Sequence, residues 1–195
     1  MNSIANVSRR EFIRGMFSTG ALVLGASLAP EILWARTSAT AASANDAVLS
    51  PNVFVAIQSD DTISIIAARS EMGTGISTAL PSVLADELDA DWSKVKIHQG
   101  DGDKRYGDQD TDGSHSVRSF FDVMRGCGSA ARFMLIQAAA EQWKVPAGEC
   151  ETRVGTVTHR HSGRSLTYGQ LAAPASRLKV PDPAQLRFKP ASAWR

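Results

Sequence analysis

The pattern of apolar and polar positions predicts several short strands between Val53 and His98. Val53–Ile57 is a continuous apolar run, and Thr62–Ala68 is rich in isoleucine. The pair Asp60-Asp61 between them is typical of a turn, so the two runs predict a β-hairpin. Lys94–His98 alternates like a further strand that is half buried.

Two longer segments have the spacing of helices. Apolar residues recur every three or four positions in Ser77–Leu88 and again in Val117–Trp143, which predicts one shorter and one long helix. Val154–His159 and Ser165–Thr167 predict a second hairpin, whereas Val180–Arg195 contains three prolines and no clear period. The expected fold class is α+β, with a β-hairpin and mixed strands packed against the two helices.

The first residues of the chain are arranged like an export signal. Arg9 and Arg10 close a short polar segment, and Phe12 is the apolar residue that the twin-arginine consensus has two places after the pair. An uncharged, apolar stretch follows over Gly15–Ala29, and small residues dominate Thr37–Ala44. This layout favours export to the periplasm by the twin-arginine translocase. The alternative is an amphipathic first helix with two adjacent arginines that occur by chance.

Composition and charge narrow the classes of partner. The chain has 195 residues and a net charge of +1, so it has no basic field that could hold nucleic acid. Its two cysteines, Cys127 and Cys150, lie far apart, which excludes a disulfide framework, a zinc ribbon and an iron–sulfur cluster held by this chain alone. No apolar run reaches the roughly 18 residues of a membrane span.

Two glycine-containing loops carry the candidate chemistry. Gly73-Thr74-Gly75 stands between a predicted strand and a predicted helix, where free backbone N–H groups and the helix dipole favour an anion. Gly113–Ser116 precedes the long helix in the same way. Each loop has a structural alternative, namely a tight strand–helix turn for the first and a serine N-cap for the second. The candidate binding residues are Gly73, Thr74, Gly75, Thr78, Gly113, Ser114, His115 and Ser116.

The second loop also permits a hypothesis of cation binding. Asp108–Gly113 matches the opening of an EF-hand, D-x-[DN]-x-[DN]-G. However, Ser119 stands where the bidentate glutamate belongs, and Lys94–Gln99 reads as a strand where a helix is needed. Binding of a cation by the aspartates of residues 108–112 in another geometry stays open.

The sequence offers no convincing catalytic group. The four histidines lack the HxxxH or HExxH spacing of zinc ligands, so we assign no metal ligand. Glu71, Asp86 and Glu87 could act as general bases, but no nucleophile–base pair accompanies them. We therefore nominate no catalytic residue.

The order and spacing of several motifs resemble a known family. The motifs are Arg69–Gly75, Ala85–Val95, Thr111–Arg118, Gly128–Arg132 and Ser162–Arg164. Together they resemble the molybdopterin-binding subunits of the xanthine dehydrogenase/aldehyde oxidase family. The nearest branch is that of the two-subunit isoquinoline 1-oxidoreductase-like proteins and their membrane-associated aldehyde dehydrogenase relatives. One position departs from the resemblance, because Thr74 stands where the family often has glutamine.

This resemblance implies a molybdenum–molybdopterin cofactor, in its cytosine dinucleotide form, held in part by the two glycine-containing loops. It implies oxidation of an aldehyde or an N-heteroaromatic compound with oxygen taken from water. Electrons are then expected to pass to a small partner subunit that carries [2Fe–2S] clusters, and onward to a membrane cytochrome c.

The resemblance also sets the expected domain organisation. Family chains are several times longer, and their catalytic glutamate lies in parts that this sequence lacks. We expect a signal and small-residue linker over residues 1–44, the N-terminal part of a molybdopterin-binding domain over 45–150, and the second hairpin with a truncated, proline-rich linking segment over 151–195. Such a fragment is expected to be inactive alone. The alternatives are an exported, non-catalytic cation-binding module and a decayed gene product that does not fold.

Overall fold

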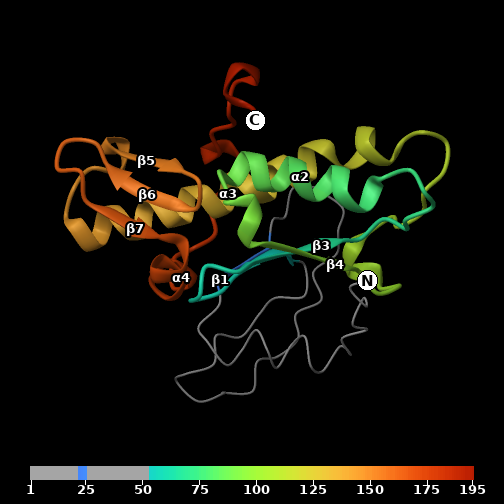
Figure 1. The fold of residues 1–195 in the computed structure, drawn as a ribbon, viewed down its shortest axis with the longest axis horizontal. Coiled ribbons are helices and arrows are strands. Elements are labelled where there is room, and N and C mark those ends of the chain that lie inside the picture. The colour runs from blue at the N-terminus through green and yellow to red at the C-terminus, as the bar shows by residue number, and fades with distance from the viewer. Residues whose placement is uncertain (1–21, 26–52) are drawn as a thin grey trace, which may run out of the picture.

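The computed structural model describes residues 22–25 and 53–195, and arranges them as two small sheets and three α-helices (Figure 1). The first sheet has the order β1-β2-β3-β4, with β1 at Leu22–Gly25, β2 at Val53–Ile57, β3 at Ile63–Ala67 and β4 at Val95–Gln99. Helices α2 (Ile76–Leu88) and α3 (Ser116–Trp143) lie over one face of this sheet. The observed fold class is α+β, as the periodicity predicted.

The predicted first hairpin is confirmed. Strands β2 and β3 are antiparallel, with Ile57 opposite Ile63. The N–H of Asp61 donates to the carbonyl oxygen of Gln58 across the turn (3.1 Å). Strands β3 and β4 are parallel, and parallel neighbours need a long crossover connection. Helix α2 supplies that crossover, so the alternation of strand and helix patterns in the sequence follows directly from the topology.

Strand β1 lies within the segment that the sequence marks as an export signal. It pairs antiparallel with β2, with Val23 opposite Ala56, and extends the sheet at the edge away from β4. Arg9, Arg10 and Phe12 lie outside the described residues. Four residues of the predicted signal are therefore paired with the sheet, which the sequence pattern did not indicate.

The two predicted helices are confirmed, each starting one residue earlier than expected. They pack against each other at Gly128 of α3. A Cβ atom at Gly128 would stand 2.5 Å from the carbonyl oxygen of Leu84 and 3.0 Å from the Cβ of Glu87. Because no side chain occupies this position, the two helix backbones approach closely.

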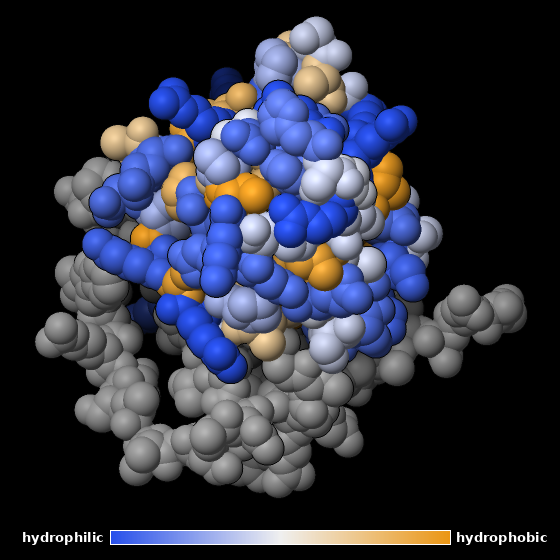
Figure 2. All heavy atoms as spheres, turned by 90° about the vertical axis from the view of Figure 1, so that its left-hand side faces the viewer, coloured by the Kyte–Doolittle hydropathy of each residue, from blue (hydrophilic) through white to orange (hydrophobic). Residues whose placement is uncertain are grey.

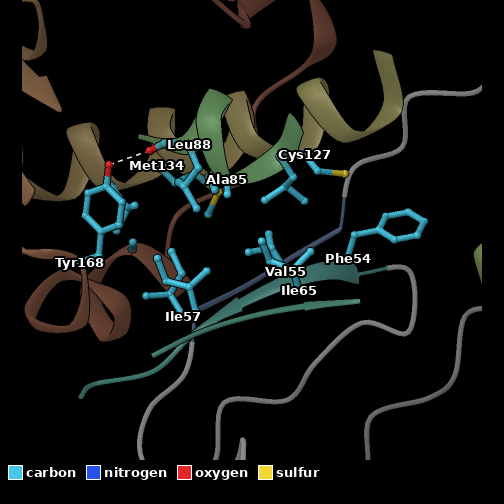
Figure 3. Close-up of a cluster of buried hydrophobic side chains, with 14 of the residues drawn as sticks. Phe54, Val55, Ile57, Ile65, Ala85, Leu88, Cys127, Met134 and Tyr168 are labelled. Atoms are coloured by element: carbon cyan, nitrogen blue, oxygen red, sulfur yellow. Dashed lines mark hydrogen bonds between the residues drawn. The ribbon is translucent and has the colours of Figure 1, made fainter. Parts of the chain in front are cut away.

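The main hydrophobic core lies between these helices and the first sheet. Figure 3 shows part of this cluster, with Phe54, Val55, Ile57, Ile65, Ala85, Leu88, Cys127, Met134 and Tyr168. The Tyr168 hydroxyl donates to the carbonyl oxygen of Leu88 at 2.7 Å, and burial raises the pKa of Tyr168 so that it stays protonated. Burial also raises the pKa of the Cys127 thiol to about 12, which makes Cys127 an unreactive packing residue.

The second sheet has the order β5-β6-β7 and is followed by helix α4. These elements are β5 at Cys150–Arg153, β6 at Thr156–His159, β7 at Ser165–Thr167 and α4 at Tyr168–Ser176. The predicted hairpin is confirmed as β6 and β7, whereas β5 and α4 were not predicted. Helix α4 begins with a capping box in which the side chain of Thr167 accepts from the N–H of Gln170, and the side chain of Gln170 accepts from the N–H of Thr167.

The surface on the side of the second sheet is mainly hydrophilic. Figure 2 shows this side with its apolar side chains scattered among polar ones. Among the helices of the described segments, none is both long and apolar enough to cross a membrane.

The C-terminal segment, residues 180–195, is held on α2 and α3 by buried charged side chains. Glu87 is 1% exposed, and its carboxylate accepts from Arg125 Nε at 3.0 Å, Arg132 Nη2 at 2.9 Å and the backbone N–H of Lys189 at 2.7 Å. The Lys189 ammonium in turn lies 3.0 Å from the carboxylate of Asp89. This segment lacks an apolar period because polar groups attach it to the helix pair. Glu87 is therefore a structural ion-pair partner and not a free general base.

Gly128→Ala is expected to lower the free energy of unfolding by about 1–3 kcal/mol, because overpacking forces the helices apart. The intrinsic preference of alanine for helices, about 1 kcal/mol, works in the opposite direction. Urea denaturation measures the net loss. Gly148→Ala is the control, because a Cβ there meets nothing within 4 Å. A gain in stability of about 1 kcal/mol in Gly128→Ala, the value of the helix preference alone, would contradict the close helix contact.

Candidate functional site

The first candidate loop lies in the connection from β3 to α2, which is exposed from Ser70 to Gly75. Gly73 (φ 83°) and Gly75 (φ 78°) both adopt the left-handed conformation that favours glycine. A Cβ at either position would meet nothing within 4 Å, so the backbone here is open to an approaching ligand. Thr74 stands exposed between the two glycines, and Met72 beside them is 70% exposed.

Two of the amides at the start of α2 are bonded to a side chain of the preceding loop. The Glu71 carboxylate accepts from the N–H of Gly75 (Oε1, 3.1 Å), and from the N–H and hydroxyl of Ser77 (Oε2, 3.0 and 2.8 Å). Bonds from Ser77 and then from Gly75 lower the pKa of Glu71 to about 2. The sequence led us to expect these donors to be available to an external anion, and the structure corrects this. Glu71 caps the turn; it is not placed as a general base.

Thr78, the last candidate of this loop, lies in the first turn of α2. Its backbone N–H donates to the carbonyl oxygen of Gly75 at 3.1 Å, and the residue is exposed. Thr78 therefore sits next to the Glu71 cap, on the open side of the molecule.

The second candidate loop leads into the long helix α3. Gly113 (φ 49°) and Ser114 (φ 55°) are both left-handed, and His115 is the N-cap residue without a side-chain capping bond. The serine N-cap alternative is therefore wrong for this helix. Ring nitrogen Nε2 of His115 lies 2.6 Å from the Asp112 carboxylate. Ser116 is buried in the first turn of α3.

Arg69 is the residue that joins this helix start to the sheet. It is 1% exposed, and its Nε donates to the hydroxyl of Ser116 at 3.2 Å. Its Nη1 donates to the carbonyl oxygen of Asp108 at 2.9 Å and lies 2.8 Å from the Asp108 carboxylate. The guanidinium stacks over the ring of Phe120, 5.1 Å from its centroid. Its Nη2 has no hydrogen-bond partner among the described residues.

Further contacts bring the bases of the two loops together. The N–H of Ser70 donates to the carbonyl oxygen of Gln109 at 3.1 Å, and the hydroxyl of Thr111 donates to the carbonyl oxygen of Ser70 at 2.6 Å. A polar cavity of about 530 Å³ lies beside these contacts, lined among others by Ser70, Gln99, Lys104, Asp108, Gln109 and Asp110. The two candidate loops are thus joined through Arg69 and Ser70.

The aspartates of residues 108–112 do not converge on a common centre. Asp108 pairs with Arg69, which is the main cause of its lowered pKa, and Asp112 pairs with His115. Within the described ranges, no group of three or more His, Cys, Asp or Glu side chains is arranged to hold a metal ion. The cation-binding alternative gains no support from this geometry.

Neither Glu71 nor Arg69 was predicted from the sequence as a binding-site residue. Glu71 accepts hydrogen bonds from residues four and six positions further on, so its capping role is a local feature of the run E-M-G-T-G-I-S. Arg69 acts on residues 39 and 47 positions away. No local pattern in the sequence carries that information.

A family model described as a molybdopterin cofactor-binding domain matches residues 6–194 of this chain. The chain is 45% identical over 143 residues to isoquinoline 1-oxidoreductase subunit beta of Brevundimonas diminuta, a match that covers 70% of this chain and 18% of the relative. It is 31% identical over 194 residues to membrane-bound aldehyde dehydrogenase (pyrroloquinoline-quinone) of Gluconacetobacter polyoxogenes, which covers 98% of this chain and 25% of the relative. The chain therefore spans about a quarter or less of the length of these relatives.

Solved structures show a similar fold. Quinoline 2-oxidoreductase from Pseudomonas putida 86 matches with a TM-score of 0.51 and 20% identity, over 61% of this chain and 15% of that one. CO dehydrogenase from Oligotropha carboxidovorans matches with a TM-score of 0.55 and 19% identity, over 65% of this chain and 16% of that one. The fold agrees with the motifs and with the family model, and the chain belongs to the molybdopterin cofactor-binding domain family.

Proposed function

We propose that this chain forms part of the cofactor site of a molybdenum hydroxylase that oxidises an aldehyde or an N-heteroaromatic compound with oxygen from water. The family match over residues 6–194 is the observation that carries the proposal. The names of the two relatives support the substrate classes, since one is an isoquinoline oxidoreductase and the other an aldehyde dehydrogenase.

The start of α3 fits an anionic part of the cofactor. Its first turn has no side-chain cap, and the amides of a helix N-terminus together with the helix dipole attract negative charge. The buried guanidinium of Arg69, which is paired with Asp108, lies beside Ser116 and donates to its hydroxyl. Gly113–Ser116 would therefore bind a phosphate oxygen, and Arg69 would hold Ser116 in place.

The first loop offers a different kind of contact. The amides of Gly75 and Ser77 are bonded to Glu71, so the open glycine backbone and the exposed Thr74 are the groups left to meet a ligand. The molybdenum centre of the bound cofactor supplies the oxidation chemistry. This chain's residues bind and orient the cofactor, and we assign none of them a proton-transfer role.

We further propose export to the periplasm by the twin-arginine translocase, a cytosine dinucleotide form of the cofactor, and a small [2Fe–2S] partner subunit that passes electrons to a membrane cytochrome c. The name "subunit beta" of the first relative supports a partner subunit. The distant cysteines, Cys127 and Cys150, agree with clusters held elsewhere. We also propose that this chain alone is inactive, since a single wall of a pocket leaves its ligand exposed.

The cofactor proposal predicts that pterin and molybdenum copurify with the chain when it is produced in cells that make the cofactor. Fluorescence of the oxidised pterin and mass spectrometry of the metal measure both, and an assay with aldehydes and N-heteroaromatics is expected to show no turnover. Pterin-free protein would contradict the cofactor proposal. Molybdenum-dependent turnover would contradict the proposed inactivity.

Arg69→Met is expected to reduce pterin retention about 10-fold or more, because it removes a charge-assisted bond worth roughly 1.5–3 kcal/mol at the start of α3. Arg69→Lys, which keeps the charge, is expected to retain more. Arg105→Met is the matched control, since Arg105 pairs with Asp103 only two residues away. Equal pterin content in Arg69→Met and wild type would remove Arg69 from the site.

The export proposal predicts that replacing Arg9 and Arg10 together by lysine leaves the protein in the cytoplasm. Cell fractionation and immunoblotting measure this, with replacement of Lys94 and Lys96 by arginine as the control. Undiminished periplasmic protein in the double-lysine variant would contradict the twin-arginine route.

A further inference from the structure

We propose that Glu71 is a positioning residue that fixes the shape of the loop over residues 72–75, so that this loop meets a ligand through its outer edge at Met72 and Thr74. On this account the amides at the start of α2 are not a ligand site. The proposal rests on the proposed function, in which this loop borders the cofactor.

Both carboxylate oxygens of Glu71 are engaged. Oε1 accepts from the N–H of Gly75, and Oε2 accepts from the N–H and the hydroxyl of Ser77. These three bonds tie the residue that precedes the loop to the first turn of the helix that follows it. The carboxylate therefore closes the loop at its base.

The two glycines and Met72 of this loop have open surroundings. Neither Gly73 nor Gly75 has an atom within 4 Å of where a Cβ would stand, and Met72 is largely exposed. Glycine has the widest choice of backbone conformations, so an unsupported loop with two glycines loses its shape easily. The three bonds to Glu71 are thus a restraint on the conformation of this segment.

The charge of Glu71 also decides where an anion can bind. With a pKa lowered to about 2, the carboxylate is ionised throughout the physiological range. A phosphate at the start of α2 would have to replace this bonded carboxylate and would be repelled by it. The start of α3 has no such carboxylate cap, and it has Arg69 beside it. The two helix starts therefore differ in function, although their sequences look alike.

The test compares Glu71→Ala and Glu71→Gln with wild type by amide hydrogen exchange at Gly75 and Ser77. Alanine removes both acceptor oxygens and is expected to lower protection at these amides about 10-fold or more. Glutamine keeps one acceptor oxygen and is expected to rescue part of the protection and most of the pterin retention. Glu141→Gln makes the same chemical change at an exposed position of α3 and is the control.

Adding inorganic phosphate to Glu71→Ala separates the two roles of the loop. We expect phosphate to leave the amides of Gly75 and Ser77 unprotected. Restored protection would overturn the proposal, because it would make the start of α2 an anion site that Glu71 merely fills. Wild-type pterin retention in Glu71→Ala, with protection lost, would also overturn it. Absence of pterin from wild type would instead count against the proposed function, since the exchange measurements need no cofactor.

The pH dependence gives a readout that a packing role would not change. A carboxyl group whose pKa is lowered in the folded state stabilises that state above its ordinary pKa of 4.5, and loses this contribution as pH falls towards 2. The stability difference between wild type and Glu71→Gln is therefore expected to shrink between pH 5 and pH 2. A difference that stays constant with pH would show that the charge of Glu71 has no part in holding the loop.

Discussion

The arrangement of the candidate site depends on the bonds that the buried guanidinium of Arg69 makes to Asp108 and Ser116. A charge removed from water is costly unless it is paired and hydrogen-bonded. Arg69 meets that requirement with Asp108 and Ser116, which lie 39 and 47 residues further along the chain. Because Arg69 lies just beyond Ala67, the last residue of β3, its bonds fix the start of α3 and the loop before it against the end of the sheet.

The two helix starts show how similar sequences acquire different electrostatics. Both α2 and α3 follow glycine-containing loops, and both helix dipoles favour an anion. The chain itself supplies the anion at α2, in the form of Glu71, whereas at α3 it places the ion pair of Arg69 and Asp108. On the proposed function, a phosphate group binds at the start of α3, where no carboxylate caps the helix. The glycines determine where the backbone is open, and the neighbouring charges determine which opening suits an anion.

The sequence allowed the elements with a clear apolar period to be predicted, namely the first hairpin, β4, the two main helices and the β6–β7 hairpin. It did not reveal β5, whose four residues include three polar ones, or α4, which is short and contains Pro174. The capping box at Thr167 and Gln170 was a usable signal for α4. The same holds for the candidate site. The glycines in the sequence identified both loops, whereas the distant partners of Arg69 could be identified only from the folded structure.

The exposure of these loops indicates that the proposed cofactor site is incomplete in this chain. Sites for small molecules and cofactors usually bury about 70–90% of the ligand's surface. Here Met72 is 70% exposed, and Thr74 and Ser114 are exposed as well. A cofactor resting on these two loops would be covered on one side only, so the proposed site needs further walls. The relatives are several times as long as the matched region, which leaves room in such proteins for residues that close the pocket and perform proton transfer.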